Sequence, residues 1–304
     1  MKSTSIKNAR KINKGRYILG IVICSLVLFL TLVGLSLSLS DFFQSGSSEA
    51  GIGTLKMFTT ISNIIAAVAA ATCLPFQIDG LRRDRYRLPS WIVIVMYVGT
   101  VGVFLTFFTA LTLISAFQGF VETMFTRSSL FMHTINPILI TTLFVVVVSD
   151  TRIKFSYSFI SIGPTIIYMI VYAIMVFGIG MWNDHYKANA FIPWPVTLII
   201  VIIVSFGIAQ LLRVLHNLMN KHITKSIERY YKESPDFDFP VIGKAIAHLA
   251  AIESKFYHEG DDICMPVDII EYLTERYQAN KLPLDILYDI YLDNYLINIG
   301  KKAA

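Results

Sequence analysis

The chain has 304 residues, of which 55% are hydrophobic and 15% are charged, and its net charge is +5. A soluble domain carries about 25% charged residues, so the composition excludes a disordered chain and a small disulfide scaffold and indicates an integral membrane protein with a polar appendage. The first 216 residues hold 16 Lys and Arg against 7 Asp and Glu, whereas residues 217–304 hold 10 against 14. Because the basic excess lies in short loops between apolar runs, we expect no nucleic-acid partner.

Six apolar runs are long enough to cross a hydrocarbon core of ~30 Å, which takes about 20 helical residues. In chain order they are residues 17–39, 57–76, 91–117, 130–148, 159–181 and 195–215. An open sheet edge in lipid would leave backbone groups unpaired. The predicted fold is therefore all-α, with a six-transmembrane-helix bundle over 1–216 and a small cytoplasmic helical tail over 217–304. We expect the second run, rich in small residues, inside the bundle.

The loops between these runs alternate in charge. The side that carries the N-terminus holds 13 Lys and Arg, and the other side holds three. This asymmetry predicts a multi-pass protein of the plasma membrane with both termini in the cytoplasm. The first run follows a basic lead, but its apolar core of 23 residues is longer than that of a signal peptide and no small-residue cleavage site follows. We expect it to be a retained span.

The tail after residue 216 repeats apolar residues at helical spacing. The positions are Val267, Ile270, Leu273 and Tyr277, and then Leu284, Leu287, Tyr291 and Tyr295. Asp268 and Asp285 suit helix first turns. This pattern predicts two or three short amphipathic helices. They either pack on one another or bind a cytoplasmic protein.

One ionisable side chain, His133, lies well inside a predicted span, since Arg213 lies at a span end. Burying such a group costs free energy, so an ionisable residue in a membrane span is by default a candidate functional residue. The alternative is a neutral imidazole that only joins two helices by hydrogen bonds.

Several polar residues share the predicted depth of His133. Thr60 lies three residues inside the second span, as His133 does inside the fourth, and both spans run inward from the outer leaflet. Asn63 follows Thr60 by about one helical turn, and Asn136 follows His133 by about one turn. Thr134, directly after His133, is a further polar residue at this level. A hydroxyl beside an imidazole is the minimum for an activated nucleophile with a general base. The alternative is again plain interhelical hydrogen bonding.

Short motifs at these positions resemble a known family. Phe58-Thr-Thr-Ile-Ser-Asn63 is similar to the F-T-x-x-S-N signature of bacterial Pr6Pr-type membrane proteins. Phe131-Met-His-Thr-Ile-Asn-Pro137 resembles the M-H-T-x-x-x-P stretch of the related FAR-17a/androgen-induced family, and Gly180-Met-Trp182 followed by Pro193-Trp-Pro195 resembles its G-M-W-x-Y-P motif with an insertion. The resemblance covers residues 15–216.

The resemblance implies an intramembrane threonine hydrolase of fatty-acid-type esters, with Thr60 as the nucleophile and His133 as the base. Its substrate would be a membrane lipid or lipid-like ester, and its setting a bacterial plasma membrane. Trp182, Asp184 and His185, in the predicted outer loop, would gate entry or orient His133, or else are solvated loop residues. No cofactor or metal is expected, because no carboxylate–histidine cluster surrounds His185. The alternatives are a non-enzymatic lipid-binding or transport protein and a protein that acts through its tail.

Overall fold

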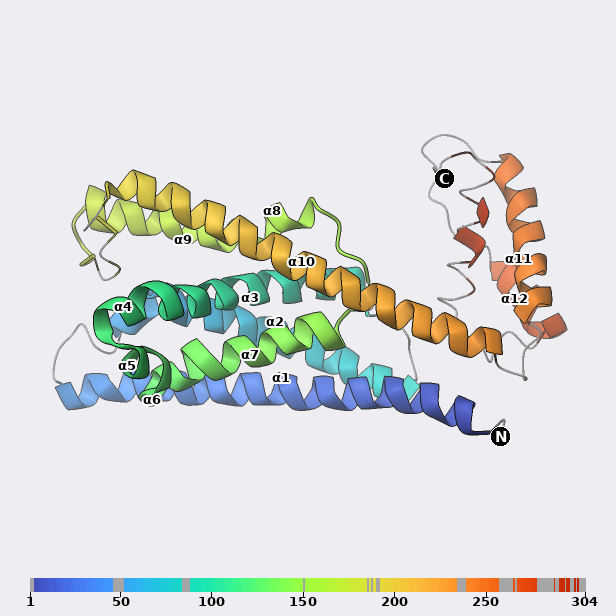
Figure 1. Cartoon of the computed structure of the whole chain (residues 1–304), viewed down its shortest axis with the longest axis horizontal. Helices are drawn as coiled ribbons and strands as arrows, with labels where there is room; N and C mark the ends of the chain where they lie inside the picture. The colour runs from blue at the N-terminus through green and yellow to red at the C-terminus, as the bar shows by residue number, and fades with distance from the viewer. Residues whose placement is uncertain are drawn as a thin grey trace. The chain divides into compact units, whose positions relative to one another are not determined.

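The computed structural model contains helices joined by loops and turns, with no strand, in the residues it describes (Figure 1). These are residues 3–45, 52–83, 88–149, 151–184, 186, 188–189, 192–233, 239–256, 265, 267–277, 287, 290–292, 294–295, 298 and 300. They form two compact units. One contains Gly15–Arg83 and Leu88–Lys221, and the other contains the remaining described residues.

Five helices in the described residues are long and apolar enough to cross a membrane: Lys14–Ser40, Phe58–Arg82, Ser90–Phe117, Arg127–Val147 and Trp194–His222. A sixth apolar helix, Gly163–Gly178, is shorter. The chain is thus an all-helical, multi-pass membrane protein. The elements of the bundle are α1 (Ser3–Ser45), η1 (Ile52–Lys56), α2 (Phe58–Arg83), α3 (Ser90–Thr109), η2 (Ala110–Ile114), α4 (Ser115–Gln118), α5 (Phe120–Phe125), α6 (Arg127–Ser129), η3 (Leu130–Ile135), α7 (Asn136–Thr142), η4 (Leu143–Val147), α8 (Tyr157–Ser161), α9 (Gly163–Ala173), η5 (Ile174–Gly178) and α10 (Trp194–Glu233).

The fifth predicted span, 159–181, is divided in the structure. The short helix α8 ends at Ser161, and α9 begins at Gly163 and continues through η5 to Gly178. Pro164 lies directly at the start of α9; a proline has no backbone N–H and disfavours the helical conformation of the residue before it. The uninterrupted apolar helix is therefore about 24 Å long at 1.5 Å per residue, shorter than the sequence pattern predicts.

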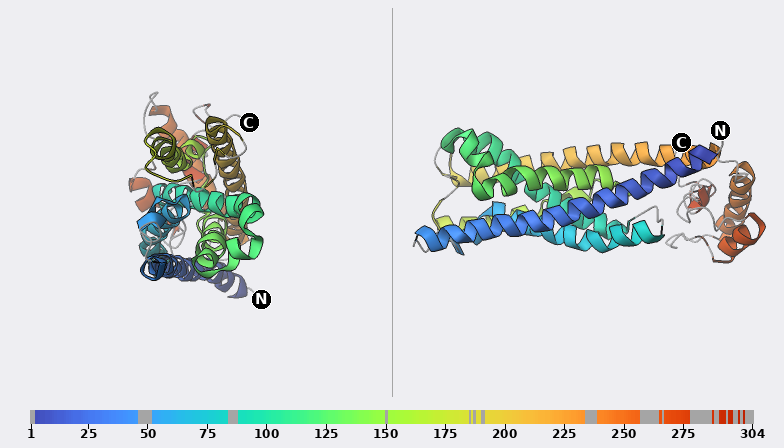
Figure 2. Two further views of the ribbon diagram at one scale, coloured as in Figure 1. Left: turned by 90° about the vertical axis from the view of Figure 1, so that its left-hand side faces the viewer. Right: turned by 90° about the horizontal axis from the view of Figure 1, so that it is seen from below.

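The most buried of the described spans is α3. In the most apolar part of each span, 56% of the α3 residues are buried against 39% for α2. Seen from two directions, α3 lies between α1 and the α9–α10 pair (Figures 1 and 2). The small residues of α2 do pack tightly, because a Cβ at Gly99 of α3 would lie 3.1 Å from both Ala66 Cα and Ala69 Cβ.

The fourth span contains a wide, π-helical turn that holds the predicted base. His133 lies in η3, and Pro137 is the second residue of the α-helix that follows it. In a regular α-helix the residue at position 137 would donate its N–H to the carbonyl of His133, and a proline cannot do so. A π-helical segment before the proline accommodates this lost hydrogen bond. Such segments are frequent at functional sites.

A second histidine, His216, is fully buried within the bundle. It lies within the span Trp194–His222 of α10, so His133 is not the only imidazole inside the described spans. Its Nδ1 is 2.9 Å from the carbonyl oxygen of Phe144, and its Nε2 is 2.8 Å from that of Thr151. The ring also stacks on Phe144, with centroids 4.6 Å apart. His216 therefore joins α10 to the end of the fourth span.

The second unit includes α11 (Phe239–Glu253), η6 (Ser254–Phe256) and α12 (Val267–Tyr277). Its buried core gathers Ile242, Ile246, Ala250, Met265, Ile269, Leu273, Leu287, Tyr291 and Tyr295. Four of these residues are positions of the predicted amphipathic repeats. Leu284 and Asp285 lie outside the described residues. These helices bury apolar faces against one another.

Candidate functional site

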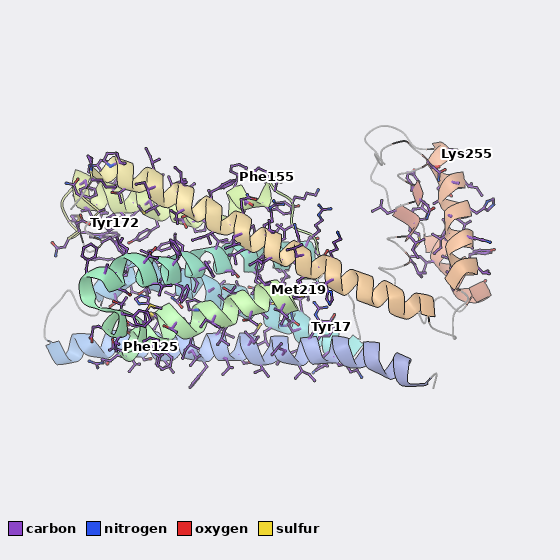
Figure 3. The ribbon with its side chains drawn as sticks, in the orientation of Figure 1. Tyr17, Phe125, Phe155, Tyr172, Met219 and Lys255 are labelled. Atoms are coloured by element: carbon purple, nitrogen blue, oxygen red, sulfur yellow. The ribbon has the colours of Figure 1, made fainter. Side chains whose placement is uncertain are left out.

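The structure brings a threonine hydroxyl to His133 at the end of the bundle where α2 begins. The Oγ1 atom of Thr59, in the first turn of α2, is 3.3 Å from Nε2 of His133. The other ring nitrogen, Nδ1, is 2.8 Å from the backbone oxygen of Thr123 in α5. Three elements therefore meet at one imidazole. Figure 3 labels Phe125 and Tyr172 at this end and Tyr17 and Met219 at the opposite end of the bundle.

The partners of the ring assign its tautomer. A carbonyl oxygen only accepts hydrogen bonds, so Nδ1 of His133 carries the hydrogen and donates it to Thr123. In the neutral ring, Nε2 then holds a lone pair and accepts the hydrogen of the Thr59 hydroxyl. This is the polarity that a general base requires, with the backbone carbonyl in the orienting position that a carboxylate takes in a serine triad. The separation of 3.3 Å is slightly longer than an ideal hydrogen bond, as the bonds of catalytic pairs often are without a bound substrate.

Thr60, the predicted nucleophile, is buried with 1% of its surface exposed. The hydroxyl within hydrogen-bond distance of His133 is that of Thr59, one residue earlier. Successive residues of an α-helix point about 100° apart around its axis. With Thr59 turned toward the imidazole, Thr60 therefore projects from a different part of the α2 surface.

The predicted supporting amides lie beneath this pair and are fully buried. Asn63 Nδ2 donates to the backbone oxygens of Thr59 at 2.8 Å and Met132 at 3.1 Å. Asn136 Nδ2 donates to Asn63 Oδ1 at 3.0 Å and to Thr31 Oγ1 of α1 at 3.0 Å. This network connects α1, α2 and the fourth span directly under the Thr59–His133 pair. The amides therefore position the pair through the backbone rather than touching the imidazole.

Thr134 stabilises the same region from the other side. Its Oγ1 donates to the backbone oxygen of Met124 at 2.7 Å, beside the bond from His133 to Thr123. The last carbonyls of a helix have no partner within that helix. Here two carbonyls of the short helix α5 are satisfied by the side chains of two successive residues of η3. The position of α5 is thereby tied to that of the imidazole.

The loop after the fifth span delivers Tyr186 to the start of α2. The hydroxyl oxygen of Tyr186 accepts a hydrogen bond of 2.8 Å from the backbone N–H of Phe58. Asp184 holds this loop, since its Oδ1 accepts from the Tyr172 hydroxyl at 2.8 Å and from the Ala188 N–H at 2.9 Å. Asp184 therefore organises the loop rather than contacting His133.

Of the two other predicted gate residues, the structure describes Trp182 but not His185. Trp182 packs edge-on against Tyr172, with centroids 6.4 Å apart, and Lys56 Nζ lies 5.9 Å from the centroid of its indole. The tryptophan thus lies among aromatic and cationic side chains at the rim of the bundle. His185 lies outside the described residues. Among the residues that the structure does describe, no three His, Cys, Asp or Glu side chains gather as metal ligands would.

Two buried polar atoms next to the pair have no hydrogen-bond partner: Thr123 Oγ1 and Asn136 Oδ1. Leaving a buried polar group unpaired costs about 1–3 kcal/mol. Both belong to residues whose other polar atoms hold the imidazole or the amide network. These two oxygen atoms can therefore accept hydrogen bonds from a bound molecule.

The sequence pattern singled out His133 and the two asparagines as candidates, whereas the contacts of His133 with Thr59 and the Thr123 carbonyl, and the position of Tyr186, come from the structure alone. Thr59 and Thr60 are adjacent and equally deep, so depth alone does not separate them. Tyr186 lies in the same loop as the predicted gate residues Trp182, Asp184 and His185, and this position was its only signal in the sequence. A backbone carbonyl leaves no sequence signal.

The fold and the site together define a multi-pass membrane protein with a Thr–His pair at one end of its helical bundle. Comparison with known protein-family models, with curated proteins and with solved structures finds no match to this chain.

Proposed function

We propose that this protein is an intramembrane hydrolase of amphiphilic acyl esters, in which Thr59 is the nucleophile and His133 the general base. The observation that carries the proposal is the polarity of the pair. The Thr59 hydroxyl faces the ring nitrogen that is free to accept a proton, and the other nitrogen is held by the Thr123 carbonyl. The motif resemblance to the FAR-17a/androgen-induced and Pr6Pr-type proteins supports the same reaction class.

The proposed reaction has two halves. Thr59 Oγ1 attacks the ester carbonyl carbon while its proton passes to His133 Nε2, and the tetrahedral intermediate then collapses. The C–O bond to the alcohol breaks, and the imidazolium returns the proton to the departing oxygen. Water then attacks the acyl-threonine with His133 again as base, which releases the acid and restores the Thr59 hydroxyl.

The position of the pair suits an amphiphilic substrate. Thr59 lies in the first turn of α2, and His133 lies six residues after the start of its span at Arg127. The acyl chain would lie among apolar helices while the carbonyl and incoming water meet at the polar rim. With six spans oriented as the loop charges predict, this rim faces the outer leaflet of a plasma membrane.

Hydrolysis of a chromogenic medium-chain ester, 4-nitrophenyl octanoate, by the full chain in detergent tests the proposal. Thr59→Ala and His133→Ala should abolish turnover and labelling by a fluorophosphonate, whereas Thr59→Ser should retain both. Thr60→Ala is the matched control and should remain active. Wild-type turnover in Thr59→Ala would overturn the mechanism.

A second candidate function is lipid or small-molecule binding without chemistry. The unpartnered Thr123 Oγ1 and Asn136 Oδ1 favour it, because a ligand with hydrogen-bond donors would satisfy atoms that the protein leaves unpaired. Such a protein would be stabilised against heat by an amphiphilic amide or alcohol and would show no covalent labelling by the fluorophosphonate. The labelling gel therefore separates the two candidates.

A further inference from the structure

The hydroxyl of Tyr186 lies at the N-terminal end of α2, next to the proposed nucleophile. Its oxygen accepts the backbone N–H of Phe58 at 2.8 Å. It also interacts with the hydroxyls of Thr59 and Tyr168. Tyr168 is itself anchored, because its hydroxyl donates to the backbone oxygen of Lys56 at 2.9 Å. The phenol thus reaches the reacting group from a loop that is distant from it in sequence.

The hydrogens of this cluster can be assigned one by one. The Tyr168 hydrogen goes to the Lys56 carbonyl, and the Thr59 hydrogen goes to His133 Nε2. The Phe58 N–H already points at the Tyr186 oxygen. These bonds leave the hydroxyl hydrogen of Tyr186 unassigned, and the hydroxyls of Thr59 and Tyr168 are its neighbours in the cluster. A donor placed in this way lies beside the oxygen that attacks the substrate.

We propose that Tyr186 is a third catalytic residue of this site and donates a hydrogen bond to the carbonyl oxygen of the ester as that oxygen gains negative charge. The inference rests on the proposed hydrolase function. When Thr59 Oγ1 bonds to the carbonyl carbon, the π electron pair moves to the carbonyl oxygen, which is one atom away from the attacking oxygen. Tyr186 keeps its proton throughout and only turns its O–H to this oxyanion. This electron pair forms the carbonyl π bond again when the C–O bond to the alcohol breaks.

The surroundings of Tyr186 keep the donor in place and protonated. Its ring lies 5.5 Å from that of Tyr172, whose hydroxyl is bonded to Asp184 at the start of the same loop. The ring of Tyr168 packs on that of Phe58, with centroids 5.1 Å apart, so Tyr168 is also held in place by an aromatic contact. Desolvation by the surrounding protein raises the pKa of the Tyr186 phenol. It therefore remains an O–H donor at neutral pH.

The test compares Tyr186→Phe with Tyr157→Phe, which removes a tyrosine hydroxyl at α8. Losing one oxyanion donor lowers kcat by about 10²–10³-fold, so Tyr186→Phe should lower the turnover of 4-nitrophenyl octanoate to this extent with little change in KM. Tyr157→Phe should match the wild type. Both variants should elute as the wild type does in size-exclusion chromatography.

A second variant tests the donor chemistry separately from structure. Incorporation of a fluorinated tyrosine at position 186 keeps the O–H but lowers its pKa, so it should restore turnover and move the alkaline limb of the rate profile to lower pH. Wild-type turnover in Tyr186→Phe, alongside inactive Thr59→Ala and His133→Ala, would overturn the role of Tyr186 alone. Activity retained in Thr59→Ala would instead overturn the hydrolase mechanism itself.

Discussion

Asp184 accepts a hydrogen bond of 2.8 Å from the hydroxyl of Tyr172, and this bond joins the loop after the fifth span to the span itself. The same carboxylate accepts the N–H groups of Ala188 and Asn189. A carboxylate that accepts several hydrogen bonds makes a short loop rigid. Tyr186 lies within this loop, so Asp184 sets the position of its phenol although it does not touch the reacting atoms.

Replacing Asp184 by Ala should lower ester turnover by about tenfold, which corresponds to about 1.4 kcal/mol in the barrier, because Tyr186 is then less firmly held. Asp184→Asn keeps one acceptor oxygen and should lose less. Rates with 4-nitrophenyl octanoate measure the effect. Glu122→Ala, which changes an exposed acid on α5, is the control. Equal rates for Asp184→Ala and the wild type would show that the loop does not position the site.

His216 should contribute more to stability than to chemistry. Its replacement by Leu leaves the carbonyls of Phe144 and Thr151 without the ring nitrogens that they now face. A carbonyl oxygen only accepts hydrogen bonds, so the neutral ring donates its single N–H to one of these two carbonyls. Leaving that buried carbonyl unpaired costs about 1–3 kcal/mol, so the thermal unfolding temperature in detergent should fall clearly. His222→Leu, at an exposed position of the same helix, should unfold close to the wild-type temperature. An unchanged unfolding temperature for His216→Leu would contradict this role.

The contact between α2 and α3 predicts a difference between two glycines. A Cβ at Gly99 would lie 3.1 Å from the Cα of Ala66, whereas a Cβ at Gly207 would meet nothing within 4 Å. Gly99→Ala should destabilise the fold by about 1–3 kcal/mol, because the two helices must move apart. Gly207→Ala should be neutral or stabilising by up to about 1 kcal/mol, since Ala favours the helix. Thermal unfolding of both variants in the same detergent decides the comparison, and equal unfolding temperatures would contradict it.

The sequence by itself determined the class of this protein, a multi-pass helical membrane protein, and it predicted the depth of the candidate site. Runs of about 20 apolar residues can be satisfied only as helices in lipid, and an ionisable residue such as His133 is costly there. These are properties of composition along the chain. They predicted six spans, of which the structure has five as long apolar helices and the fifth in chain order as a shorter one. They also predicted one polar level for His133, Asn63 and Asn136.

Only the tertiary structure decided which groups meet. The rotation of α2 about its axis, which is set by packing against α3, turns Thr59 rather than Thr60 toward His133, because adjacent helical residues point about 100° apart. The orienting group of the imidazole is a backbone carbonyl, which every residue has, so no residue type reveals it. Tyr186 arrives from a loop more than 120 residues away from Thr59, and such a distant contact follows from the path of the folded chain rather than from local spacing.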